Sequence, residues 1–289
     1  MSRLIKANFS RLFKSIFFRV CLIFSAGLGI FLDIMRYIDI QRNQEIYDEL
    51  GIEYKSADGF VFSGILYIIF AIAPFVAVFV GTEYSDGTIR NKLMVGHKRT
   101  EIYFANFIVC AAADIIILMS FIVACLVGGL ILLRATSLMA TQIIIFTLSQ
   151  CVTMIGFSAL LVLLAMLIQN KAGSAVTVLI MTIIMFFATM TIADRLRQPE
   201  YYEDYRETIV NEETGEMTVI PENVKNPRYL SGTKREIYEF LNKFLPINQF
   251  YQVAVENDEN INIMALYSVI IIILANGAGV VLFRRKDLK

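Results

Sequence analysis

The sequence predicts an all-α integral membrane protein with six transmembrane helices, an interfacial helix at the N-terminus, and an outer segment containing helix and strand between the fifth and sixth spans. Apolar residues make up 57% of the 289 residues and charged residues only 18%, and the apolar residues gather in long runs. About 20 consecutive apolar residues cross the hydrocarbon core as a helix, which satisfies its own backbone hydrogen bonds. A lipid bilayer is therefore the expected surroundings of most of the chain.

Six apolar runs are long enough to cross a membrane. They are residues 15–35, 60–80, 104–133, 142–168, 173–193 and 263–283. The first run follows basic residues, as in a signal peptide, but it is long for such a peptide and no small-residue cleavage pattern follows cleanly. We therefore expect spans one to five within residues 15–193, the outer segment at 194–262, and the sixth span with a basic tail at 263–289.

Basic residues predict the orientation of the spans. Lys and Arg gather before the first span, between the second and third spans, and after the last, which all lie on one side if the spans alternate. The positive-inside rule then places both termini in the cytoplasm. We expect a multi-pass protein of the plasma membrane.

Residues 1–14 predict an amphipathic helix. Leu4 and Leu12 belong to an apolar stripe at helical spacing, whereas Arg3 and Lys6 lie on the other face. Such a helix suits the inner leaflet, where anionic lipid attracts its basic groups. The alternative is that these residues simply begin the first span. Basic groups continue through about three helical turns, which favours the interfacial helix.

Several kinds of chemistry find no support in the sequence. Cys21, Cys110, Cys125 and Cys151 all lie in predicted spans, and His97 is the one histidine. These residues offer neither a metal-binding spacing nor a catalytic triad. There is also no GxxxxGK[ST] loop, so we expect no nucleotide site and no cofactor in this chain. A membrane-embedded enzyme is therefore poorly supported, and no span offers the polar face of an ion channel.

The stretch from 81 to 103, GTEYSDGTIRNKLMVGHKRTEIY, separates the second and third spans. Asp86-Gly87 is a turn signal, residues 88–95 predict a short helix, and Gly96 is a left-handed stop. A helix held level with the membrane surface suits a cleft on another protein, but an ordinary positive-inside loop has a similar composition. The residues by themselves leave both interpretations open.

This stretch, extended as GTEYSDGTIRNKLMVGHKRTEIYFAN, resembles the segment between the second and third spans of type-2 ABC transporter permeases. In that family a glutamate and a GT(I/L)R element are followed by a helix and a basic turn, and the loop is the coupling helix that sits on a separate ATPase. The six spans, the interfacial helix and the large outer segment are similar too. The resemblance implies that transmission to the ATPase involves Glu83, Tyr84, Ser85, Gly87, Thr88, Ile89, Arg90 and Asn91.

The resemblance implies the permease subunit of an ATP-driven exporter in a bacterial cell membrane. Its expected partners are an ABC ATP-binding subunit, which would bind the ATP and Mg, a second permease copy or a sister permease, and membrane lipid, with no nucleic acid. Similar permeases handle peptides, lipids, drugs and glycan precursors, and these substrate classes stay open. The alternative function is a non-transporting membrane sensor or immunity protein that binds a peptide through its outer segment.

Two polar residues inside the predicted spans are expected to meet. Asp114 and Gln150 lie at similar depths, and polar groups in a span face the bundle interior. We predict an interhelical hydrogen bond between them, with a structural role favoured. The alternative is that Asp114 faces substrate or is linked to proton movement.

The outer segment has its own pattern. Residues 208–210 and 217–220 predict a hairpin around a turn at 213–216, and a helix with an apolar stripe follows from Thr233 to Pro246. The resemblance implies that residues 248–256 form a re-entrant or interfacial return towards the sixth span. We expect a lid over the outer mouth, with substrate release or selection as the alternative role.

Overall fold

The computed structural model of the chain describes residues 1–51, 61–133, 138–210 and 217–286. In chain order the elements are α1 (Ser2–Lys14), α2 (Ile16–Glu49), α3 (Ile65–Ser85), α4 (Thr88–Met94), α5 (Arg99–Leu133), α6 (Ala140–Ile168), α7 (Lys171–Arg197), β1 (Tyr201–Val210), β2 (Met217–Lys225), α8 (Thr233–Phe244), α9 (Pro246–Ala254) and α10 (Ile261–Arg285). Among the described residues, six helices are long and apolar enough to cross a membrane: α2, α3, α5, α6, α7 and α10. The predicted all-α membrane fold is confirmed.

The first span is longer than the sequence pattern predicted. α2 continues beyond residue 35 to Glu49, with a kink at Asn43. Hydrogen bonds between side chains stabilise the polar C-terminal part of α2. Asn43 and Tyr47, one and two helical turns after Asp39, donate to the Asp39 carboxylate at 2.8 and 2.6 Å. The predicted start of the second span, Phe60, lies outside the described residues, and α3 begins at Ile65.

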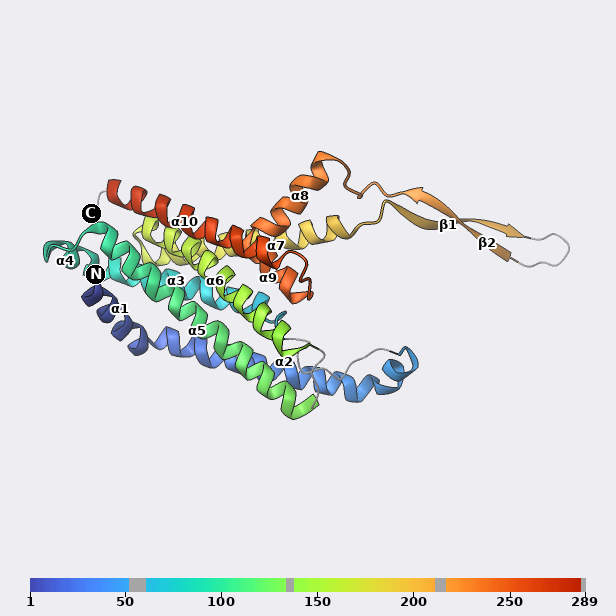
Figure 1. Ribbon diagram of the computed structural model, residues 1–289, viewed down its shortest axis with the longest axis horizontal. Helices are drawn as coiled ribbons and strands as arrows, with labels where there is room; N and C mark the ends of the chain where they lie inside the picture. Colours follow the sequence, from blue (N-terminus) through green and yellow to red (C-terminus); the bar gives the residue numbers. More distant parts are fainter. Residues whose placement is uncertain (52–60, 134–137, 211–216, 287–289) are drawn as a thin grey trace. The chain divides into compact units, whose positions relative to one another are not determined.

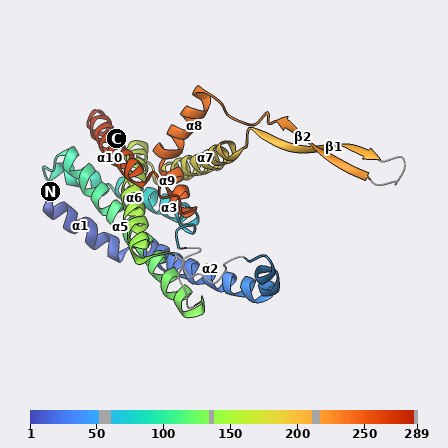
Figure 2. The same cartoon turned by 45° about the vertical axis from the view of Figure 1, so that its right-hand side comes forward.

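The chain divides into two compact units, one formed by residues 1–186 with 243–289 and the other by residues 187–242. The first unit is a helical bundle in which α2 and α1 pack on α5, and α10 packs on α6. The N-terminus and the end of α10 lie at the same end of this bundle as α4 (Figure 1), and the turned view agrees (Figure 2). Contacts support this: the N-terminal amino group is 3.5 Å from Glu101, and Arg99 Nη1 donates to the Phe283 carbonyl at 3.1 Å.

The second unit contains the predicted hairpin. β1 and β2 are antiparallel, with Thr208 opposite Val219 and Val210 opposite Met217. The two strands are therefore confirmed, while the predicted turn at 213–216 lies outside the described residues. The helix α8 begins at Thr233, directly after Gly232, whose φ of 58° is left-handed.

The predicted return at 248–256 is mostly helix α9, which belongs to the first unit. Gln249 fixes this helix from a fully buried position. Its amide nitrogen donates to the carbonyls of Lys243 and Phe244 at 2.9 and 3.2 Å, and its oxygen accepts from Thr153 and Ser268 at 2.9 and 2.5 Å. Residues 194–262, expected as one outer segment, are thus shared between the two units.

Candidate functional site

The connection between α3 and α5 is built by two left-handed glycines. Gly87 has φ of 66° and Gly96 has φ of 95°, a region that residues with a Cβ rarely adopt. Gly87 N donates to the Tyr84 carbonyl at 3.1 Å, and Gly96 N donates to the Leu93 carbonyl at 2.9 Å. The short helix α4 lies between these corners, so the predicted turn, helix and stop are confirmed.

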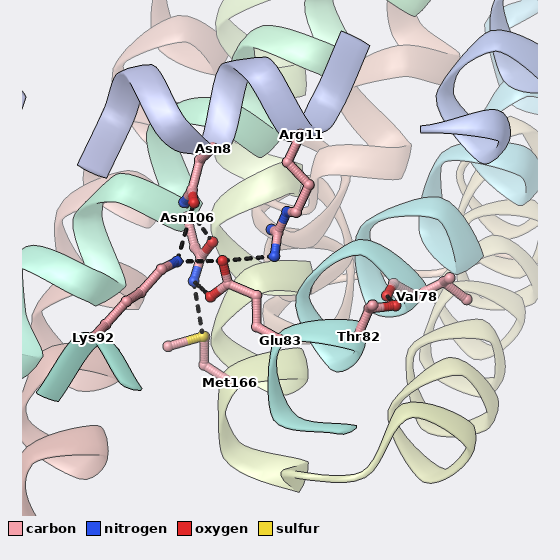
Figure 3. Close-up of polar contacts among 8 residues, drawn as sticks. All are labelled: Asn8, Arg11, Val78, Thr82, Glu83, Lys92, Asn106 and Met166. Carbon is pink, nitrogen blue, oxygen red and sulfur yellow. Dashed lines mark hydrogen bonds and ion pairs between the residues drawn. The ribbon is translucent and has the colours of Figure 1, made fainter. Parts of the chain in front are cut away.

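Glu83, at the end of α3, is the centre of a buried polar cluster (Figure 3). Its side chain has no exposed surface, yet one of its oxygens, Oε1, binds Arg11 Nη1 at 2.7 Å and also binds Lys92 Nζ. The other oxygen accepts a hydrogen bond from Asn106 Nδ2 at 2.8 Å. Since these partners belong to α1, α4 and α5, a single carboxylate joins four helices.

Asn8 of α1 closes the cluster. It accepts a hydrogen bond from Lys92 Nζ at 3.0 Å and donates one to Asn106 Oδ1 at 2.9 Å. The Asn106 amide nitrogen also lies 3.8 Å from the Met166 sulfur, which brings α6 to the edge of the same group. We call Asn8, Arg11, Glu83, Lys92 and Asn106 the Glu83 cluster.

The Glu83 cluster carries more positive than negative charge, because the single carboxylate faces both Arg11 and Lys92. Burial lowers the pKa of Lys92, and the attraction of Glu83 opposes this shift. The Arg11 guanidinium also stacks 4.0 Å from the centre of the Phe79 ring. Ion pairs in a low dielectric are strong, and removing one partner is costly. The arrangement is suited to a rigid mechanical joint.

A second link connects the end of α3 to the turn between α6 and α7. Tyr84 Oη donates to the Met166 carbonyl at 2.6 Å. A Cβ at Gly81 would lie 2.8 Å from Lys171 Cα, so only glycine permits this contact between α3 and the start of α7. The turn itself is held by Asn170, whose side chain accepts from Ala172 N at 2.9 Å.

The predicted transmission residues divide by exposure. Glu83 and Ile89 are buried, whereas Tyr84, Gly87 and Thr88 are half-buried and Ser85, Arg90 and Asn91 are exposed. Only the half-buried and the exposed residues have surface for a direct contact with another protein.

The sequence interpretation missed two further exposed residues in this loop. Met94 and Val95, at the end of α4, are 77% and 79% exposed. Exposed apolar side chains that form a patch mark sites of contact with protein or membrane. The sequence offered one indication of these two residues, because they are large apolar residues within an otherwise charged loop.

Asn8, Arg11, Lys92 and Asn106 were also missed as partners of Glu83. A signal existed for Asn8, which lies between Leu4 and Leu12 at helical spacing and therefore on the inward face of α1. Asn106 stands in the apolar sequence of α5 and is completely buried.

The predicted hydrogen bond between Asp114 and Gln150 is wrong. The Gln150 amide donates instead to the Phe62 carbonyl at 3.2 Å. The buried Asp114 carboxylate interacts with the Ser158 hydroxyl and makes no hydrogen bond to Gln150. Similar depth did not make the side chains face each other. A second intramembrane acid, Asp33, was missed: it accepts from Cys125 Sγ at 3.3 Å. In the described part of the chain, no group of three or more His, Cys, Asp or Glu could hold a metal ion.

Comparison with known proteins identifies a family for this chain. A family model described as ABC-2 family transporter protein matches residues 4–189. The matched range includes all five residues of the Glu83 cluster, the whole of α4, and Met166. No curated protein and no solved structure matches the chain.

Proposed function

The chain belongs to the ABC-2 family of transporter proteins, and we propose that it couples ATP hydrolysis in a separate subunit to the export of a substrate. It is a multi-pass membrane subunit of an ABC transporter, and its family implies an ATP-binding partner. Members of this family lack an ATPase site of their own. The observation that carries the coupling proposal is the Glu83 cluster, which ties α4 to three other helices.

In this proposal α4 is the coupling helix, and its two sides have different tasks. The exposed side, with Arg90, Met94 and Val95, contacts the ATP-binding subunit. The opposite side is anchored inside the protein through buried Ile89 and through Lys92, which binds Glu83. A displacement of α4 therefore reaches α3 through charged groups instead of being lost in a flexible loop.

The displacement then spreads along two routes. Asn106 and Arg11 carry it from Glu83 to α5 and α1, and the Tyr84 hydroxyl carries it to the end of α6. A rigid element that links several spans is what a transition between two arrangements of the bundle requires. Binding and release of ATP would shift the population of inward-open and outward-open or collapsed arrangements.

We further propose that α4 and both termini face the cytoplasm of a bacterial plasma membrane, and that a second permease copy or a sister permease completes the pathway. The proximity of the N-terminus, the start of α5 and the end of α10 supports placing them on one side. Among the short segments that flank the spans, those at this end also carry most of the basic residues, as the positive-inside rule requires. A sensor or immunity protein that does not transport would need no rigid anchor behind α4, so we do not favour that alternative.

Site-specific crosslinking tests this proposal. A photoreactive residue replaces Met94, which is 77% exposed, and the matched control replaces Leu266 of α10, which is 58% exposed. We expect the Met94 position, in membranes of the native host, to form one crosslinked product with a protein that binds ATP, and the control to form none. If Met94 links only to lipid or to proteins that do not bind ATP, the proposed role of α4 is wrong.

A further inference from the structure

We propose that the outward face of α1 binds anionic lipid headgroups and that this binding adjusts the Glu83 cluster. The first half concerns this chain alone. The second half, an effect on coupling, rests on the proposed function. The proposed partner is an anionic lipid surface next to α1.

The charge of the N-terminal region is the first observation. Arg3, Lys6, Arg11, Lys14 and Arg19 precede the first acidic residue of the chain, Asp33. On α1 itself, Arg3, Lys6 and Lys14 are exposed, and we call these three residues the basic face. With no acidic side chain on the helix to neutralise it, the basic face attracts anionic surfaces.

The position of α1 is the second observation. Ser15 interrupts the helix with an extended backbone, and the long apolar helix α2 begins at the next residue. α1 is therefore held where a membrane-crossing helix starts, at the level of the headgroups. Phe13, Ile16 and Phe17 are large, apolar and exposed at this junction. Basic groups followed by exposed aromatic groups are typical of a helix at the membrane interface.

The inward face of α1 makes the lipid contact relevant to coupling. The apolar stripe was expected to lie on the leaflet, but Leu4 and Leu12 are buried against the bundle, because α1 packs on α5. Between them, Asn8 bonds to Asn106 and Lys92, and Arg11 binds Glu83. A force on the basic face is thus applied to a helix whose other face supplies two members of the Glu83 cluster.

The charge of the Glu83 cluster explains how bound lipid would act on it. Two cations face one carboxylate there, so phosphate groups beside α1 would offset the excess positive charge. Each Lys or Arg strengthens association with an anionic surface by roughly fivefold, so that the basic face contributes on the order of 100-fold. An acidic surface of the ATP-binding subunit could attract the same residues, and the test below separates the two partners.

The test uses the full chain in nanodiscs of phosphatidylcholine or of an equal mixture of phosphatidylcholine and phosphatidylglycerol. The variant is Arg3→Gln/Lys6→Gln/Lys14→Gln. The matched control is Lys225→Gln/Arg228→Gln/Lys234→Gln, which removes three exposed basic residues of the other unit. The first readout, amide hydrogen exchange of α1, needs no partner protein. We expect phosphatidylglycerol to slow this exchange at least about tenfold in the wild type and the control, and not in the variant.

The second readout is ATP hydrolysis by the complex with the ATP-binding subunit. We expect phosphatidylglycerol to change its rate severalfold in the wild type and not in the variant. Equal α1 exchange in the two lipids overturns the proposal, whether or not an ATP-binding subunit is found. Slower exchange without an effect on hydrolysis overturns the link to the Glu83 cluster. Protection of α1 by the ATP-binding subunit in both lipids alike shows that the basic face binds protein instead.

Discussion

Replacing Glu83 with glutamine should destabilise the protein strongly while keeping the shape of the side chain. The carboxylate is fully buried and binds two cations, one of which, Lys92, has a side chain that is only 12% exposed. In Glu83→Gln the amide can still accept the Asn106 hydrogen bond, but both cations lose their counter-charge. Breaking a buried ion pair from one side costs about 3–5 kcal/mol. Solvent screening of Arg11, whose side chain is 29% exposed, places the expected loss at the lower part of that range.

The matched control is Glu239→Gln. Glu239 also pairs with an arginine, Arg235 at 2.9 Å, but its side chain is 45% exposed. An exposed pair of this kind contributes about 0.2–1 kcal/mol. Thermal unfolding of the purified proteins in one detergent should therefore show a clearly lower Tm for Glu83→Gln and an almost unchanged Tm for Glu239→Gln.

A second variant tests the origin of the loss. If unpaired charge is the cause, Glu83→Gln combined with Lys92→Met should be more stable than Glu83→Gln alone, because the least exposed unpaired cation is gone. Equal Tm values for Glu83→Gln and Glu239→Gln would refute the argument that Glu83 is the centre of a buried electrostatic joint.

Three further changes test the parts around this joint. Gly87→Val places a β-branched residue at a φ of 66° and should lower the stability by about 1–2 kcal/mol, whereas Gly87→Asn should be tolerated. Coupled ATP hydrolysis is measured for both variants. Equal activities of the two would mean that the left-handed corner at Gly87 is not needed for coupling. Tyr84→Phe removes the hydroxyl that donates to the Met166 carbonyl, so we expect a loss of about 1 kcal/mol of stability and weaker stimulation of ATP hydrolysis by substrate. Unchanged stimulation would contradict the proposed route from Tyr84 to α6. For Lys92, burial lowers the pKa, so the cost of its buried charge is fully present below the folded pKa and disappears as the pH rises towards the ordinary value of 10.5. The stability of the wild type relative to Lys92→Met should therefore increase in the alkaline range just below 10.5. Unfolding curves at several pH values measure this difference, and a constant or falling difference would contradict a lowered pKa of Lys92.

The local parts of the structure could be predicted because their causes are local. Run length and hydropathy determine the six spans, and the need for a left-handed residue explains Gly87 and Gly96 at the corners of α4. The extension of α2 had a readable cause as well, since Asp39, Asn43 and Tyr47 follow at spacings of one helical turn.

The Glu83 cluster could not be predicted, because its partners are set by packing between distant segments. Asn8 and Asn106 are 98 positions apart, and nothing in either segment indicates the other. The wrong pairing of Asp114 with Gln150 has the same origin. Counting residues gives the depth of a side chain in a span. The direction in which the side chain points depends on how each helix is rotated about its own axis when the helices pack together.

The coupling role of α4 is tested by ATP hydrolysis of the complex that purifies with the tagged chain from its native membrane, compared with the complex from Arg90→Glu. Arg90 is exposed on α4, so reversing its charge should leave folding intact while disturbing a contact with the ATP-binding subunit. We expect an ATP-hydrolysing subunit to accompany the wild type and to be lost or uncoupled in the variant. A well-folded wild type without an ATPase, or a variant with unchanged coupled hydrolysis, would contradict this coupling role.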